Sequence, residues 1–197
     1  MMTTASLPKT FRRAILQVSG PTMTTRTAQR FASLYTAHAM PDSRTLRRHL
    51  QNNILPGLAL YQLQREDGLS QDAALDKIAQ TLVLVAAGDR RQMKLLGRMP
   101  FAYPLLRLVI KPAMNLYPAP GWAIEWVENS PQAVRFNMKS CFYHDTFAAY
   151  GAPELTASSC AADDFVYAEM SPHIQWQRTQ TIGRGAALCD FCFARKQ

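Results

Sequence analysis

The chain has 197 residues, of which 48% are hydrophobic and 18% are charged. This composition is typical of a folded protein with a sizeable core, and it excludes a chain that is disordered over most of its length. The net charge of +8 is concentrated at one end, because residues 1–60 contain eight Lys or Arg and a single acid. No recognition motif accompanies these basic residues, so we expect no sequence-specific nucleic-acid binding.

The longest apolar stretch, residues 95–117, is interrupted by Arg98, Arg107, Lys111 and three prolines. A membrane-spanning helix needs about 18 or more apolar residues, so we expect no membrane span. The first twenty residues lack the continuous apolar stretch of a secretory signal. Four cysteines in this setting predict reduced thiols and a cytoplasmic protein, and the sequence is compatible with a homo-oligomer.

The first 120 residues form a mainly helical N-terminal region. Residues 26–39 place apolar side chains at helical spacing, and these are Ala28, Phe31, Leu34 and Tyr35. Residues 43–68 predict two abutting helices, because Pro56 favours a helix start or kink and Gly68 favours a stop.

A further helix is predicted over residues 70–88, with Ser70 as its N-cap. Ile78, Leu82 and Val85 would face the core. Residues 99–120 are apolar and proline-rich, and they predict a short buried helix with irregular ends.

Residues 121–197 form an α+β C-terminal region of order β-β-α-α-β-β, continuous with the helical region in one globular unit. Residues 122–127 and 133–138 alternate in polarity around a turn, which indicates a hairpin. Two helices follow, separated at Gly151, and residues 174–182 and 188–195 predict two more strands. The predicted fold is an antiparallel sheet with helices packed on one face.

The two closest cysteines, Cys189 and Cys192, form a C-x-x-C pattern that often marks a zinc half-site or a redox pair. Side chains three residues apart on a strand point to opposite faces of the sheet. The pattern therefore does not predict a functional pair here. It predicts one packed or functional thiol and one small residue on the other face.

The two C-terminal helices each carry a cysteine followed at i+3 by a titratable residue, Cys141 with His144 and Cys160 with Asp163. Residues at i and i+3 share a helix face, so the four groups would converge if the helices pack side by side. Such a set can supply a nucleophile with its base, or ligands for zinc. Cysteines packed as small hydrophobic residues are the alternative, and the spacing leaves it open.

The region from Cys141 onward resembles the L-2-amino-thiazoline-4-carboxylic acid hydrolase family, and the upstream "ILPGLALY" resembles that family's "ILPALALY" helix. The family pattern contains Cys189 but no second cysteine at position 192. A similar Gly-x-x-x-Cys-x-Phe ending occurs in 4-vinyl-reductase-type ligand-binding domains. The matching positions are Cys141, Gly151, Pro153, Glu154, Leu155, Cys160, Asp163, Arg178, Thr179, Thr181, Gly185, Cys189, Asp190 and Phe191.

The resemblance implies a small-molecule hydrolase that opens a cyclic amidine-like ring and yields a carbamoyl-cysteine. Water or a thiolate would attack C2 of this ring, the carbon bonded to the sulfur and two nitrogens. The adduct would then expel the ring thiolate. We expect neither a cofactor nor a metal in this reaction. The expected catalytic residues are Cys160 as nucleophile and Asp163 for proton transfer, with Cys141 and His144 as second candidates. The expected substrate-binding residues are Arg178 as carboxylate anchor, Glu154, Thr181 and Cys189.

Two other functions compete with hydrolysis. One is a non-catalytic binding or sensor domain that uses the same pocket, similar to 4-vinyl-reductase-type domains. The other is a basic scaffold whose helical region docks a partner, which predicts an exposed apolar patch on the helices.

Overall fold

The computed structural model describes residues 6–196 and contains a helical first part, followed by a part in which four strands of one antiparallel sheet alternate with further helices. The predicted α+β fold is confirmed. The helices are α1 (Lys9–Ala37), α2 (Arg44–His49), the π-helical turn η1 (Leu50–Ile54), α3 (Leu55–Glu66), α4 (Gln71–Gly97), α5 (Ala102–Ala113), η2 (Met114–Leu116), α6 (Phe142–Ala149), α7 (Leu155–Tyr167) and η3 (Ile182–Arg184). The strands are β1 (Ile124–Asn129), β2 (Ala133–Met138), β3 (Ile174–Gln177) and β4 (Cys189–Arg195).

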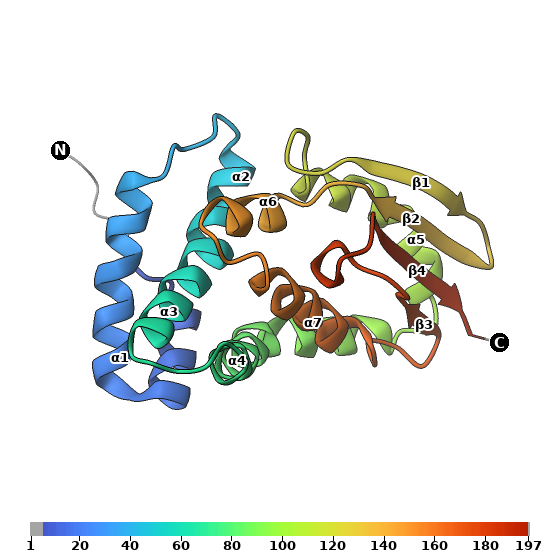
Figure 1. Ribbon diagram of the computed structural model, residues 1–197. Coiled ribbons are helices and arrows are strands. Elements are labelled where there is room, and N and C mark those ends of the chain that lie inside the picture. Colours follow the sequence, from blue (N-terminus) through green and yellow to red (C-terminus); the bar gives the residue numbers. More distant parts are fainter. Residues whose placement is uncertain (1–5, 197) are drawn as a thin grey trace.

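The elements are spread along one direction (Figure 1). Helices α1 and α3 lie at one end, the sheet lies at the other, and α4 and α7 run between them. The first core cluster lies among α1, η1, α3, α4 and α6, and the second lies between the sheet and α5. Phe142 and Tyr143 pack against both clusters. Within residues 6–196, no helix combines the length and the apolarity that crossing a bilayer requires.

Some boundaries of the N-terminal helices follow the local sequence signals, but α4 continues to Gly97, past its predicted end at residue 88. Gly20 has φ 81°, and α1 kinks there, immediately before Pro21. Pro56 lies in the first turn of α3, and Gly68 follows the end of that helix with φ 86°. Ser70 accepts a hydrogen bond from the amide of Ala73 and caps α4 as predicted.

The sheet has the order β1-β2-β4-β3, with every neighbouring pair antiparallel. Phe136 of β2 lies opposite Phe191 of β4, and the two rings stack with centroids 4.8 Å apart. Strand β3 ends at Gln177, earlier than predicted. The reason is that the backbone amides of Thr179 and Gln180 donate to the carboxylate of Asp190 instead of to a neighbouring strand.

Helix α5 lies where a helix was predicted, but it is not buried on all sides. Ala102, Tyr103 and Ile110 face the core, whereas Leu108 is 75% exposed. The prediction of a buried helix was wrong, because Ala102, Tyr103 and Ile110 join the second core cluster while Leu108 and Val109 remain exposed.

Candidate active site

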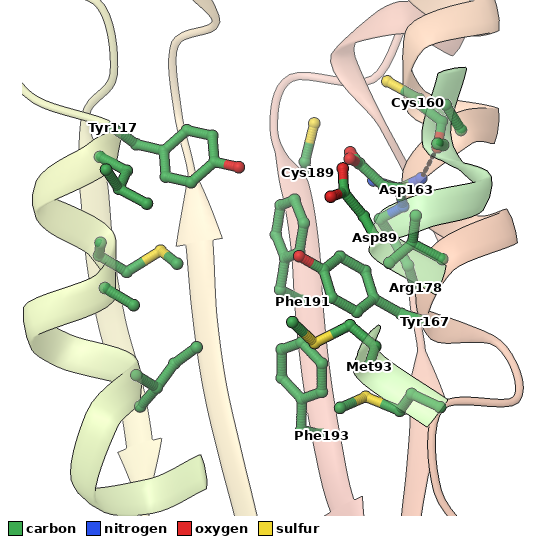
Figure 2. A pocket seen from close by; sticks show the side chains of 18 of the residues that line it. Asp89, Met93, Tyr117, Cys160, Asp163, Tyr167, Arg178, Cys189, Phe191 and Phe193 are labelled. Carbon is green, nitrogen blue, oxygen red and sulfur yellow. Dashed lines mark hydrogen bonds and ion pairs between the residues drawn. The ribbon is translucent and has the colours of Figure 1, made fainter. Parts of the chain in front are cut away.

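A cavity of about 540 Å³ lies between one face of the sheet and helices α4, α5 and α7. Most of its wall is aliphatic or aromatic, and a small set of polar groups lies among these residues. Figure 2 shows Cys160, Cys189 and Asp163 toward one end of the cavity and Met93 and Phe193 toward the other.

Helix α7 and strand β4 supply three of these polar groups. Cys160 and Asp163 lie three residues apart on α7, and both line the cavity, as their helical spacing predicted. Cys189 lies on β4 and points to the same cavity. Cys192 does not line it, which agrees with the alternation of side chains along a strand.

Cys160 and Cys189 line the same cavity, and each shifts the ionisation of the other, so that the pKa of Cys160 is raised and that of Cys189 is lowered. Burial further raises the pKa of Cys160 and opposes the lowering at Cys189. The amide of Ile182 also donates to Sγ of Cys189, at 3.2 Å. Because this amide stabilises a thiolate on Cys189, we take Cys189 as the cysteine of the two that ionises first.

Arg178 lies in the cavity wall beside Cys160 and Asp163. Its side chain is 2% exposed and forms ion pairs with Asp163 at 3.3 Å and with Asp164 at 2.8 Å. It also donates to the carbonyl oxygen of Cys160 at 2.5 Å. The guanidinium lies 5.3 Å from the ring centroid of Phe191, where a cation is attracted to the aromatic face. Arg178 is therefore held rigidly by groups of the protein itself.

The carboxyl group of Asp163 is enclosed by protein yet keeps 47% of its side-chain surface open to the cavity. Burial raises its pKa to about 6, although the nearby charge and hydrogen bond of Arg178 lower it. Burial and the nearby Asp163 charge also raise the pKa of Tyr167 to about 12. The same two causes raise the pKa of Tyr117. These tyrosines are neutral hydrogen-bonding groups around an acid that titrates near neutrality.

The other predicted site residues are only partly brought together. Cys141 lines the cavity, but it precedes α6 as its N-cap, and burial raises its pKa to about 11. His144 does not line the cavity, and its Nδ1 lies 3.3 Å from Oγ1 of Thr156. The i and i+3 argument fails here because Cys141 does not have helical backbone geometry.

Glu154 and Thr181 lie outside this cavity. Glu154 accepts a hydrogen bond from the hydroxyl of Tyr61, beside a separate polar pocket formed with residues of α1 and α3. Thr181 is buried, and its hydroxyl oxygen has no hydrogen-bond partner within residues 6–196. Neither residue is placed to contact a ligand in this cavity.

Sequence reasoning missed one acid of the cavity, Asp89. It lies on α4 with Leu82, Val85 and Met93, which also line the cavity. An acid at i+4 from Val85 and i+7 from Leu82 interrupts the apolar stripe of an amphipathic helix. This interruption could have identified Asp89 from the sequence as a candidate site residue. No group of three His, Cys, Asp or Glu side chains in the described part of the chain is placed to hold a metal ion.

Comparison with known proteins gives one family. The family model described as L-2-amino-thiazoline-4-carboxylic acid hydrolase matches residues 47–193. No curated protein matches the sequence. Among solved structures, the chain is similar to the Fe(II) unliganded H-NOX protein from K. algicida, with 12% identity and a TM-score of 0.39, over 95% of this chain and 93% of that chain. A mutant of the same H-NOX protein gives 12% identity and a TM-score of 0.38 over the same shares.

Proposed function

The chain belongs to the L-2-amino-thiazoline-4-carboxylic acid hydrolase family, and from that premise we propose that it is a hydrolase that opens a cyclic amidine-like ring with Cys189 as nucleophile. The observation that carries this proposal is that Cys189, Cys160 and Asp163 line one cavity. The nucleophile differs from the expected Cys160. The hydrogen bond from Ile182 favours the thiolate on Cys189.

The first half of the reaction forms a covalent bond to the protein. The substrate binds as an amidinium whose N–H groups donate to the carboxylate of Asp163. The Cys189 thiolate adds to C2, the carbon bonded to the ring sulfur and two nitrogens. The neutral adduct then breaks its bond between C2 and the ring sulfur. The ring sulfur leaves as a thiolate, and C2 stays attached to Cys189 as an isothiouronium cation.

The second half returns the free enzyme. Water adds to C2 while the Asp163 carboxylate accepts one of its protons. The new adduct expels the Cys189 thiolate and becomes a carbamoyl group, whose excess proton passes to the thiolate released from the ring. Asp163 then loses its proton to solvent. The net reaction is the addition of one water to the ring.

Intact-mass spectrometry tests the covalent step. Protein mixed with L-2-amino-thiazoline-4-carboxylate or its 4-alkyl analogues is quenched in acid, and the mass and the modified peptide are measured. We expect a substrate-sized increase on the peptide that contains Cys189, together with ring-opened product. Formation of product without any adduct would mean that water, and not the Cys189 thiolate, attacks C2. The absence of both product and adduct would contradict the proposal.

A second function is favoured by the cavity itself. A mostly apolar space of about 540 Å³ suits retention of a ligand as well as its turnover. A sensor or binding domain would bind the same molecules with measurable affinity and release them unchanged. Isothermal titration calorimetry would detect this binding, while the acid-quenched sample would contain neither adduct nor product.

A further inference from the structure

The cavity is too large for the small ring acid after which the family is named. That acid is one five-membered ring with an amino and a carboxyl substituent, whereas spaces of roughly 300–1,000 Å³ hold drug-sized ligands. This cavity has about 540 Å³. A ligand that fills it needs an additional body beyond the reactive ring.

The wall around that body is apolar. Helix α5 contributes Leu105, Leu106 and Ile110, and the sheet contributes Phe136 and Phe193. Figure 2 shows Phe193 and Met93 at the end away from Cys160 and Asp163. Burial of a hydrocarbon chain or aromatic group against such a wall is favourable in proportion to its apolar area.

The charges at the polar end do not suit a carboxylate. Asp89 and Asp163 line the cavity, and Arg178 is the one Lys or Arg side chain of the described residues that does so. Both terminal nitrogens of Arg178 are occupied by Asp163, Asp164 and the Cys160 carbonyl. Its Nε is buried without a partner among the described residues and is closed off from the cavity space.

His49 supplies no replacement cation. Its Nδ1 lies 3.1 Å from the hydroxyl oxygen of Tyr143, and its Nε2 lies 2.8 Å from the carbonyl oxygen of Leu116. Both ring nitrogens are therefore engaged by the protein, and burial lowers the pKa of the ring. A substrate carboxylate would meet two acids and no available positive group, which is unfavourable in a partly enclosed site.

We propose that the ligand of this cavity is an apolar molecule with an amidine-like head group and no carboxylate. The head donates hydrogen bonds to Asp163 and Asp89 beside Cys189, and the apolar body extends between α5 and the sheet toward Met93 and Phe193. The role of the head rests on the proposed function, whereas the apolar body and the missing carboxylate rest on the cavity alone.

Isothermal titration calorimetry with 2-amino-thiazolines that differ at C4 tests this assignment. The series is the 4-carboxylate, 4-methyl, 4-butyl and 4-octyl compounds. We expect each added methylene to tighten binding about fourfold until the cavity is filled. We expect the carboxylate to bind at least about tenfold more weakly than the 4-methyl compound. Tighter binding of the carboxylate, equal binding along the alkyl series, or no binding by any member would overturn the assignment.

A matched pair on α5 controls for surface effects. Leu106 lines the cavity, whereas Leu108 does not line it and is exposed. Leu106→Lys should weaken binding of the 4-octyl compound by at least about tenfold and strengthen binding of the carboxylate, because it adds a cation to the wall. Leu108→Lys should change neither. Equal effects of the two variants would contradict the placement of the body.

The ring-opening assay separates this inference from the proposed function. Binding that increases with chain length but gives no ring-opened product supports the ligand class and contradicts hydrolysis. Ring opening of the carboxylate alone supports hydrolysis and contradicts the ligand class. Melting temperatures of the Leu106 and Leu108 variants show whether each remains folded, and Leu106→Met, which keeps the wall apolar, should retain binding of the 4-octyl compound.

Discussion

The backbone amide of Ile182 donates a hydrogen bond to Sγ of Cys189, 3.2 Å away. The amide belongs to the first residue of η3, whose backbone turns so that this N–H meets the start of β4. Cys160 lines the same cavity, and its pKa is raised while that of Cys189 is lowered. The amide donor stabilises negative charge on the Cys189 sulfur, so the proton is lost from Cys189 before Cys160.

The first prediction concerns this order of ionisation. A titration followed by the ultraviolet absorbance of thiolates should show its earliest step below the ordinary cysteine pKa. Cys189→Ser should abolish that step and reduce turnover by at least about a hundredfold. Cys192→Ser, on the other sheet face, should preserve both. An early step that persists in Cys189→Ser would assign the thiolate to another cysteine.

The second prediction follows from the raised pKa of Asp163, about 6 in the folded protein against an ordinary value of 3.8. Between these pH values the folded state binds more protons than the unfolded state, so the free energy of unfolding should fall as pH rises through this window. Asp163→Asn should remove this loss. Its stability relative to the wild type should therefore increase from pH 4 to pH 7 in chemical denaturation.

Asp190→Asn is the control with the opposite sign. Burial acts to raise the pKa of Asp190, but hydrogen bonds from Thr179 and Gln180 outweigh it and lower the pKa. This contribution to stability is present above the unfolded pKa and is lost as pH falls. Asp190→Asn should therefore be less stable than the wild type at pH 7 and approach it in acid. The same pH trend in both variants would contradict the assignment of these shifts.

Much of the fold could be predicted from the sequence, because it depends on local patterns. Alternation over residues 122–127 and 133–138 predicted the hairpin of the sheet, and Ser70 predicted the start of α4. The shared face of Cys160 and Asp163 was readable for the same reason. The position of Glu154 could not be predicted in this way, because it depends on the contact with Tyr61, which is distant in sequence. Such contacts are set by tertiary packing, which local patterns do not encode.

The surroundings of Arg178 show the same limit. Its residue type suggested a carboxylate anchor, but its availability depends on Asp163 and Asp164 of α7 and on its burial. The choice between Cys160 and Cys189 as thiolate depends on the amide of Ile182, which becomes visible only when η3 meets β4. Sequence therefore identified the participants of the site more reliably than their roles.

The third prediction concerns the contact between α4 and the segment after α7. A Cβ on Gly97 would lie 1.9 Å from the carbonyl oxygen of Met170, and Ser171 donates to the Gly97 carbonyl at 2.6 Å. Gly97→Ala should therefore lower the free energy of unfolding by at least about 3 kcal/mol. A Cβ on Gly88 of the same helix meets nothing within 4 Å.

Gly88→Ala is thus the matched control. It should raise the free energy of unfolding by about 0.5–1 kcal/mol, because alanine loses less backbone entropy on forming a helix. Denaturant titration of the two variants measures both effects. Similar changes in the two would show that α4 and the segment at Met170 do not approach as closely as described.

The last prediction concerns the buried charge of Arg178. Arg178→Met leaves Asp163 and Asp164 side by side without their counter-charge. Breaking a fully buried pair costs about 3–5 kcal/mol. Because the two carboxylate side chains remain 47% and 35% exposed, we expect a smaller loss of about 2 kcal/mol at pH 7, measured by chemical denaturation.

The pH dependence of that loss distinguishes electrostatics from lost packing. Arg178 lowers the pKa of Asp163, so its removal should move the titration of Asp163 above 6. The destabilisation should then shrink toward pH 5, where Asp163 becomes neutral, and Arg178→Met combined with Asp163→Asn should cost less than the sum of the single changes. Arg26→Met, which breaks the surface pair with Asp67, should have a much smaller effect that added salt weakens further. A loss in Arg178→Met that is constant from pH 5 to pH 8 would mean that packing against Trp176 and Phe191, and not the charge, is what the guanidinium contributes.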